Sequence, residues 1–202
     1  MNIRNSILLA IILSLAGVYC YAADTYNIDP AHSGVAFTVK HMMVSKVHGR
    51  FTDFQATIQF DPKDLTKSSF SGTIKTASIT TSNEDRDADL KSEDFFDVQK
   101  FPEITFQSSK VEKSGNGYVA HGTLTMHGVS KEIAIPFTVE GPVKDQRGNE
   151  HLGVEATMTL NRYDYGLSWN KALEGGGLLV SKEVDIEISG EAVHKAEAAP
   201  AK

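Results

Sequence analysis

A strict alternation of side chains between residues 133 and 140 is the feature that most constrains how this chain can fold. Large apolar residues occupy the odd positions, Ile133, Ile135, Phe137 and Val139, and smaller or polar residues occupy the even positions. A period of two is typical of a β-strand that buries one face. Strands that each bury one face need a shared apolar interior, and roughly eight antiparallel strands can enclose one as a barrel that holds a small ligand.

The same alternation recurs along the rest of the chain. We expect strands at residues 35–40, 51–60, 70–77, 103–109, 118–126, 133–140, 152–160 and 183–189. Polar, glycine-containing turns at 114–117 and 145–149 favour hairpins, so consecutive strands should be antiparallel neighbours. The sequence thus predicts an all-β fold, an extended eight-stranded antiparallel barrel. Pro136 cannot donate a ladder hydrogen bond, which predicts a bulge or an edge position in its strand.

One short helical insertion is expected between residues 81 and 98. Thr81 and Glu84 fit a capping box, in which two side chains satisfy backbone donors at the helix start. The charged run that follows, 86–94, predicts a solvated helical face. The alternative is a plug at one end of the barrel, with a nearby carboxylate holding Arg86. The plug would consist of Phe95, Phe96 and Phe101.

The segment 167–179 allows two interpretations. Its three consecutive glycines, 175–177, predict a flexible hinge, because no Lys-Ser/Thr pair follows them as in a phosphate-binding loop. The residues on either side are unusually apolar for a loop. They fit either a lid over the barrel mouth or ordinary core packing.

The N-terminus has the layout of a secretory signal peptide, with Arg4, an apolar run at 7–18 and small residues at Ala22 and Ala23. A retained anchor is the alternative, but the run is shorter than the roughly 20 residues that span a bilayer. We expect a cleaved signal peptide at 1–22, the barrel domain at 23–192 and a disordered tail at 193–202. This organisation predicts a periplasmic protein, or a secreted one if the source lacks an outer membrane. The single cysteine, Cys20, would leave with the signal, so no disulfide is expected.

Charge excludes some partners. The chain has 20 basic and 26 acidic residues, a net charge of −6, without a basic stripe. We therefore expect no nucleic-acid partner and no attraction to an anionic membrane surface. An integral outer-membrane barrel would turn its apolar face outward, but several strands are too short for that and no aromatic girdle is visible.

Catalytic and metal-binding patterns are missing from the sequence. The seven histidines show no short ligand spacing, and no G-x-S-x-G elbow occurs. We predict a non-enzymatic protein with no catalytic residue and no metal. Two alternatives stay open: an enzyme acting on a lipid, with His127 and Asp164 as an acid/base pair, and a solid two-sheet sandwich that serves as an interaction module.

Several motifs, in order along nearly the whole chain after the signal, resemble the YceI-like polyisoprenoid-binding proteins of bacteria. The matching segments are 26–33 (YNIDPAHS), His41, 47–51 (VHGRF), 78–81 (SITT), 86–97 (RDADLKSEDFFD), 101–102 (FP), 124–131 (LTMHGVSK) and 161–166 (NRYDYG). One departure is Asp89, where the family often has histidine. Any role tied to that imidazole is not carried over to this chain.

The resemblance implies a lipocalin-like barrel that holds a long amphipathic lipid in an apolar tunnel. The ligand would be an isoprenoid quinone or a fatty-acid derivative, with no other cofactor, and a homodimer is often formed. We expect inward-facing and neighbouring apolar residues to contact it. They are Phe37, Val39, Phe54, Ile58, Ile74, Phe95, Phe96, Ile104, Phe106, Leu124, Met126, Ile135, Phe137, Met158 and Trp169. Alternation alone leaves open whether the interior is hollow or packed.

Overall fold

The computed structural model describes residues 23–196, so the expected signal peptide (1–22) and the end of the tail (197–202) lie outside the described residues. The strands are β1 (Asp24–Ile28), β2 (Gly34–His41), β3 (Ser45–Phe51), β4 (Phe54–Phe60), β5 (Ser69–Lys75), β6 (Ile79–Thr80), β7 (Glu103–Ser114), β8 (Gly117–Met126), β9 (Val129–Lys144), β10 (Glu150–Asn161) and β11 (Val180–His194). The helical elements are α1 (Glu84–Lys91) and four 3-10 turns, η1 (Pro30–His32), η2 (Leu65–Lys67), η3 (Thr76–Ser78) and η4 (Arg162–Tyr165).

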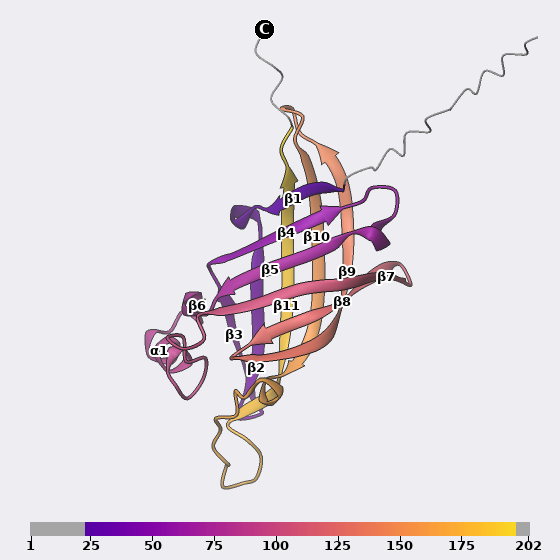
Figure 1. Cartoon of the computed structure of the whole chain (residues 1–202). Coiled ribbons are helices and arrows are strands. Elements are labelled where there is room, and N and C mark those ends of the chain that lie inside the picture. The colour runs from indigo at the N-terminus through magenta and orange to yellow at the C-terminus, as the bar shows by residue number, and fades with distance from the viewer. Residues whose placement is uncertain (1–22, 197–202) are drawn as a thin grey trace, which may run out of the picture.

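Eight of these strands form a closed antiparallel ring. The order is β1, β4, β5, β7, β8, β9, β10 and β11, and the ring closes because β1 pairs with both β4 and β11. The long strands β10 and β11 run along the molecule, and β4, β5 and β7 cross them at a steep angle (Figure 1). The predicted all-β barrel with one short helix is confirmed.

The hairpin of β2 and β3 extends the barrel along the free edge of β11. β1 pairs with β11 near Ala192, and β2 pairs with the same edge of β11 from Ser189 to Val180. β3 pairs with β2, and β6 with β3. The prediction of one strand at 51–60 is wrong, because β3 ends at Phe51 and a corner separates it from β4, which begins at Phe54.

The ladder between β9 and β10 stops at Pro136. The last register pair is Phe137 with Ala156, and within the described chain no pair joins the earlier half of β9 to β10. Proline has no N–H to donate, which agrees with the end of the β9–β10 ladder at this residue. Pro136 is not in an edge strand, because β9 lies between β8 and β10. From Pro136 back to Val129, however, β9 is paired with β8 alone among the described strands, which leaves a seam on the β10 side.

Helix α1 begins later and is capped differently than predicted. Asn83 is the N-cap, and its side chain accepts a hydrogen bond from the Arg86 amide. The capping box of Thr81 and Glu84 is wrong, because the Thr81 hydroxyl and amide both donate to the Asp87 carboxylate at 2.6 and 2.7 Å. That carboxylate thus fixes the start of the helix against the end of β6.

One end of the barrel is packed solid. Tyr26, Leu152 and Ala192 have at most 1% of their surface exposed, and they pack with Ile58 and Phe60. The C-terminal strand continues through this end to His194, so the tail begins later than the predicted residue 193.

A candidate ligand cavity inside the barrel

Away from its packed end, the barrel encloses an apolar cavity of about 290 Å³. All the strands from β1 to β11 contribute to its wall, together with Leu90 of α1 and the segment after that helix. The exposed wall is almost entirely carbon. The volume is close to the lower end of the range found for ligand pockets, about 300–1,000 Å³. The interior is therefore partly packed and partly hollow.

Most of the residues predicted to contact a ligand line this cavity. The twelve are Phe37, Val39, Phe54, Ile74, Phe95, Phe96, Ile104, Phe106, Leu124, Met126, Ile135 and Met158. The structure thus brings them together around one space. That they contact a lipid stays a prediction.

Three predicted residues lie outside the cavity wall. Ile58 belongs to the packed end, where it is the register partner of Tyr26. Phe137 is buried edge-on against Phe70, with ring centroids 4.9 Å apart. Trp169 lies behind the wall, with its ring 5.0 Å from that of Phe95.

Small side chains help to keep the cavity open. Ala56 of β4 and Gly72 of β5 are register partners on the inner face, and both line the space. A Cβ at position 72 would meet only ordinary contacts, the nearest at 3.6 Å. Gly72 therefore leaves unfilled a volume that a larger residue could occupy.

Further wall residues came from segments where alternation was weak or absent. Ile79 lies in the two-residue strand β6, Leu167 follows η4, and Val180 starts β11 before the predicted strand. Nothing in the local sequence pattern distinguishes Ile79 or Leu167 as inward-facing. Three more wall residues lie on the alternating face predicted for 183–189: Val184, Ile186 and Ile188.

Arg162 is the one charged residue among those that line the cavity. Its side chain is buried, and its guanidinium donates to three backbone carbonyls: Ser181 (2.9 Å from Nε), Leu167, and Val180 (3.4 Å). Burial lowers the pKa of this guanidinium. Because these carbonyls lie at both ends of the segment 167–180, Arg162 holds the base of that segment closed.

The segment 167–179 is neither a simple lid nor wholly core. Leu167 is buried in the core. Beyond it the chain forms a small hairpin, in which the Leu179 amide donates to the Lys171 carbonyl at 2.9 Å and Ala172 bridges Leu178. The three glycines are exposed at its turn. The hairpin projects beyond the end of the barrel (Figure 1).

Two of the three aromatic residues of the plug hypothesis lie at the cavity. Phe95 and Phe96 line the cavity, and the Phe96 ring meets Phe51 edge-on at 5.9 Å. Phe101 instead packs on the His127 ring, 4.4 Å away. Arg86 is held by Thr81, to whose hydroxyl its Nε donates at 2.8 Å, and no carboxylate is bonded to it among the described residues.

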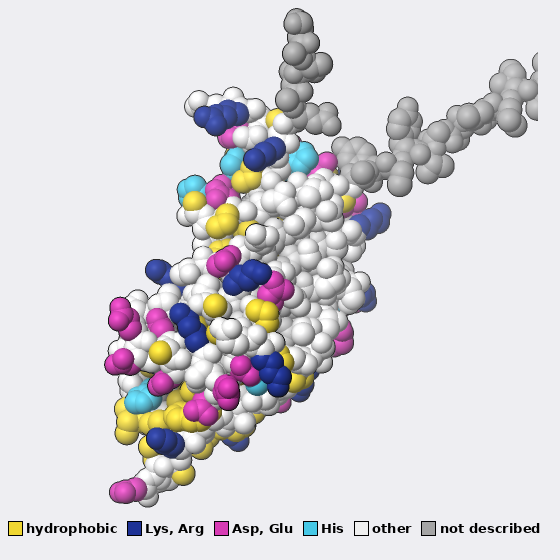
Figure 2. All heavy atoms as spheres, turned by 60° about the vertical axis from the view of Figure 1, so that its left-hand side comes forward, with side chains coloured by type: hydrophobic (Ala, Val, Ile, Leu, Met, Phe, Trp, Pro, Cys, Tyr) yellow, Lys and Arg dark blue, Asp and Glu magenta, His cyan; other side chains and the backbone are white. Residues whose placement is uncertain are grey.

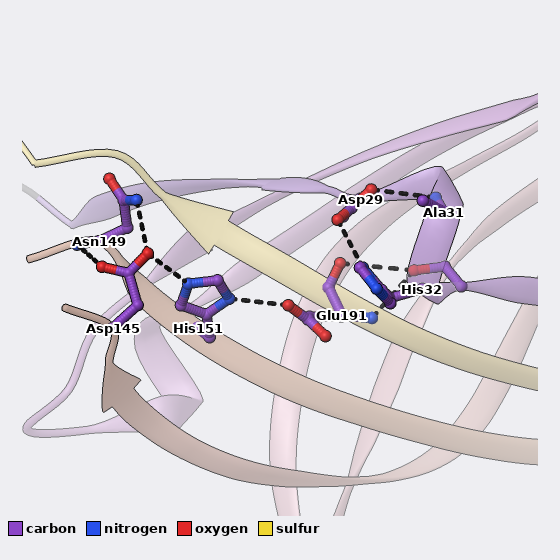
Figure 3. Close-up of polar contacts among 8 residues, drawn as sticks. Asp29, Ala31, His32, Asp145, Asn149, His151 and Glu191 are labelled. Atoms are coloured by element: carbon purple, nitrogen blue, oxygen red, sulfur yellow. Dashed lines mark hydrogen bonds and ion pairs between the residues drawn. The ribbon is translucent and has the colours of Figure 1, made fainter. Parts of the chain in front are cut away.

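A polar network lies on the surface at the packed end of the barrel (Figure 3). Glu191 of β11 binds Nδ1 of His151 at 2.7 Å, and Asp145 binds the other ring nitrogen at 3.4 Å. The bond to Glu191 raises the pKa of His151, despite opposing desolvation. A hydrogen bond from the Asn149 amide is the main cause that lowers the pKa of Asp145 to about 2.

The fold brings Glu191 near a second acid/histidine pair that spacing did not reveal. Asp29 and His32 bind each other at 2.8 Å, and ligand atoms of all three side chains lie within 4.8 Å of one another. The His151–Glu191 pair ties the β9–β10 hairpin to β11, and the Asp29 amide, which donates to the Glu191 carbonyl at 2.7 Å, ties the start of η1 to the same strand. The expectation of no metal stays a prediction.

The acid/base pair of the enzyme hypothesis is not assembled. Nδ1 of His127 is 3.2 Å from the Tyr165 carbonyl, and Asp164 pairs with Lys131 at 3.6 Å. Within residues 23–196, no hydrogen bond joins His127 to Asp164. Over the same residues, no helix has the length and apolar character that crossing a membrane requires.

A ring of antiparallel strands around an apolar cavity defines the protein as a lipocalin-like β-barrel. A family model described as the YceI-like domain matches residues 26–192, and the chain therefore belongs to that family. The resemblance seen in the sequence motifs is confirmed. The UPF0312 protein SA2479 of Staphylococcus aureus (strain N315) is 40% identical over 167 residues, which cover 82% of this chain and 95% of the relative.

Solved structures share the fold. BcnA of Burkholderia cenocepacia superposes with a TM-score of 0.72 at 25% identity, over 81% of this chain and 98% of that chain. The YceI protein of Campylobacter jejuni gives 0.67 at 33% identity, over 78% and 90%. A polyisoprenoid binding domain from Saccharophagus degradans gives 0.62 at 15% identity, over 87% and 99%, which shows similarity of fold alone.

Proposed function

We propose that this protein binds the apolar tail of an amphipathic lipid in its barrel cavity, without catalysis, for transport or storage. The observation that carries the proposal is the carbon-lined space inside an otherwise packed barrel. Membership of the YceI-like family and the fold shared with a polyisoprenoid binding domain support it. Isoprenoid quinones and fatty-acid derivatives are the ligand classes that fit such a wall, and export to the periplasm would bring the protein to them.

The cavity volume limits how much of a tail is enclosed. A space of about 290 Å³ holds about ten groups the size of a water molecule, at about 30 Å³ each. About ten buried methylenes contribute roughly 8 kcal/mol, which corresponds to micromolar affinity before the costs of association are subtracted. A longer tail must either project from the barrel or widen it.

A variant that fills the cavity tests the proposal. Gly72→Leu adds a side chain to the inner wall where its Cβ is accommodated. Displacing about four methylenes removes roughly 3 kcal/mol, so lipid affinity should fall about a hundredfold. The matched control is Thr157→Leu, which adds the same side chain on the exposed face of β10.

The measurement combines native mass spectrometry of protein purified without detergent with titration of a quinone and a fatty acid. Wild type and Thr157→Leu should retain or take up lipid, and Gly72→Leu should not. Wild-type protein that is purified empty and ignores both added lipids would refute the binding proposal. Conversion of an added lipid to product would favour the enzyme hypothesis instead.

A further inference from the structure

The end of the barrel that carries the 167–179 hairpin also carries an exposed apolar surface. Met42, Met43 and Val44, in the turn between β2 and β3, are 44%, 71% and 86% exposed. We call this turn, together with the facing hairpin 171–179, the apolar tip. Figure 2 shows hydrophobic side chains gathered at this end of the molecule. Large exposed apolar side chains that cluster in this way mark interaction sites.

The two segments form one surface. The Met42 amide donates to the Leu179 carbonyl at 2.7 Å, and the sulfur of Met43 lies 3.0 Å from where a Cβ on Gly177 would stand. Leu173, Leu178 and Leu179 of the hairpin are half-buried beside the turn. The tip thus combines residues that are more than 125 positions apart in sequence.

The turn conformation does not explain its methionines. The Val44 amide closes the turn on the His41 carbonyl, and both central residues have positive φ, 51° at Met42 and 62° at Met43. Turns with positive φ at both central residues strongly prefer Asn-Gly there, because side chains with ordinary preferences are strained in that conformation. Two large apolar residues at these positions oppose both local folding and solubility, which points to a role in binding.

Charge identifies the partner. Residues 40–48 and 171–182 contain four lysines and a single acidic residue, Glu174. The lysines are Lys40, Lys46, Lys171 and Lys182, and all four are exposed. The tip and the residues that flank it, 40–48 and 171–183 taken together, thus carry four lysines against Glu174 and Glu183, a local positive surplus although the chain has a net charge of −6. Exposed apolar residues flanked by lysines fit a bilayer surface with anionic headgroups.

The tip is continuous with the cavity wall. His41, at the start of the turn, is the register partner of Val180, and both Val180 and Val39 line the cavity. Phe95 links the wall to Trp169, which precedes the hairpin. Docking at this end would place the wall of the cavity against the bilayer, so a tail could pass between them with little exposure to water.

We propose that the apolar tip docks this protein on phospholipid bilayers with anionic headgroups, with Met42, Met43 and Val44 entering the boundary between headgroups and acyl chains. Its use in lipid exchange rests on the function proposed above, whereas docking itself does not. A second copy of this chain is the competing occupant, and the experiment separates the two.

The test uses the chain without its signal and flotation with vesicles of phosphatidylcholine and phosphatidylglycerol. The decisive variant is Met42→Asn combined with Met43→Gly, because it installs the residues that the turn prefers and so should fold at least as well as wild type. We expect wild type to float with these vesicles, less so in high salt, and the variant to bind at least tenfold more weakly. Val143→Ser is the control, since Val143 is the remaining large apolar residue found exposed within 23–196, at 67%, and lies outside the tip.

Equal flotation of wild type and the double variant would overturn the proposal, as would an equal loss in Val143→Ser. Absence of flotation together with a dimer that the double variant converts to monomers would assign the tip to a second copy. Lipid uptake from dilute solution is measured in parallel and should be unchanged in the variant. Flotation without uptake would refute the proposed function and leave docking intact. Uptake without flotation would refute docking and leave the proposed function intact.

Discussion

The ring of Phe37 lies directly over Gly49, so closely that a Cβ at position 49 would stand 2.2 Å from its Cζ atom. The two residues are register partners on β2 and β3. Phe37 lines the cavity, and its ring is 5.9 Å from that of Phe51. The missing side chain at position 49 therefore sets how far the ring reaches into the cavity.

Gly49→Ala should push the Phe37 ring into the cavity. Forcing an extra carbon into a packed site costs about 1–3 kcal/mol, so we expect a lower melting temperature together with weaker lipid binding. Phe37→Leu should restore much of both in the double variant, because the smaller side chain gives way. Thermal unfolding and lipid titration of the two single variants and the double variant measure the coupling. Additive effects in the double variant would show that the two residues do not oppose each other.

Replacing Arg162 should loosen the base of the 167–180 segment. Arg162→Met removes the donors to three backbone carbonyls, and we expect a loss of about 2 kcal/mol in the free energy of unfolding. Arg162→Lys should not restore it, because an ammonium lacks the planar fork that reaches several acceptors at once. Urea unfolding is the measurement, with Arg147→Met as the exposed control. Equal stability of Arg162→Met and wild type would contradict the clamp.

Tyr165 presents the opposite case, a polar group without a partner. It is 2% exposed, and its hydroxyl has no hydrogen bond among the described residues. Burial raises the pKa of this phenol. Because an unpaired buried hydroxyl costs about 1–3 kcal/mol, Tyr165→Phe should be at least as stable as wild type. A melting temperature several degrees lower would show that the hydroxyl makes a stabilising hydrogen bond.

Stability should depend on pH through His151. Its folded-state pKa is raised above the ordinary value of 6.5, so its contribution is complete below about pH 6.5 and is lost as pH rises through the folded pKa. Asp145, with its pKa lowered from 3.8 to about 2, contributes above about pH 4 and loses that contribution as pH falls toward 2. The network is therefore most stabilising between about pH 4 and 6.5.

The measurement is the melting temperature of wild type and His151→Asn from pH 3 to pH 9. The difference between them should be largest near pH 5 to 6 and shrink above pH 7. His32→Asn is made separately, because Asp29 raises the pKa of His32 in the same direction. A difference that stays constant from pH 5 to pH 9 would exclude His151 as the titrating group.

The sequence predicted most of the barrel wall, and its failures have physical causes. β3 was missed because Gly49 stands where alternation requires an apolar residue, and the ring of Phe37 fills that place from the neighbouring strand. Alternation gives the direction of a side chain but not its level along the barrel. For this reason Ile58 and Phe54, on the same face of β4, were predicted alike, although one packs on Tyr26 and the other lines the cavity.

The hollow interior could not be predicted for a related reason. Whether inward side chains meet depends on register across strands, such as the pairing of Ala56 with Gly72. The apolar tip was missed because the net charge averages over the whole chain, whereas four lysines lie in or next to two segments, the β2–β3 turn and the 171–179 hairpin, that only the fold brings together.

The seam that begins at Pro136 leaves one part of the described barrel wall without a backbone ladder. Residues 129–136 of β9 and 157–161 of β10 share no backbone ladder in the described chain. These two parts of the wall can therefore separate without breaking a hydrogen bond between the two strands. Ile135 on one side and Met158 on the other both line the cavity. If the protein binds lipid as proposed, we expect a tail too long for a cavity of about 290 Å³ to be accommodated by the parting of these side chains, so that one barrel takes up lipids of several lengths.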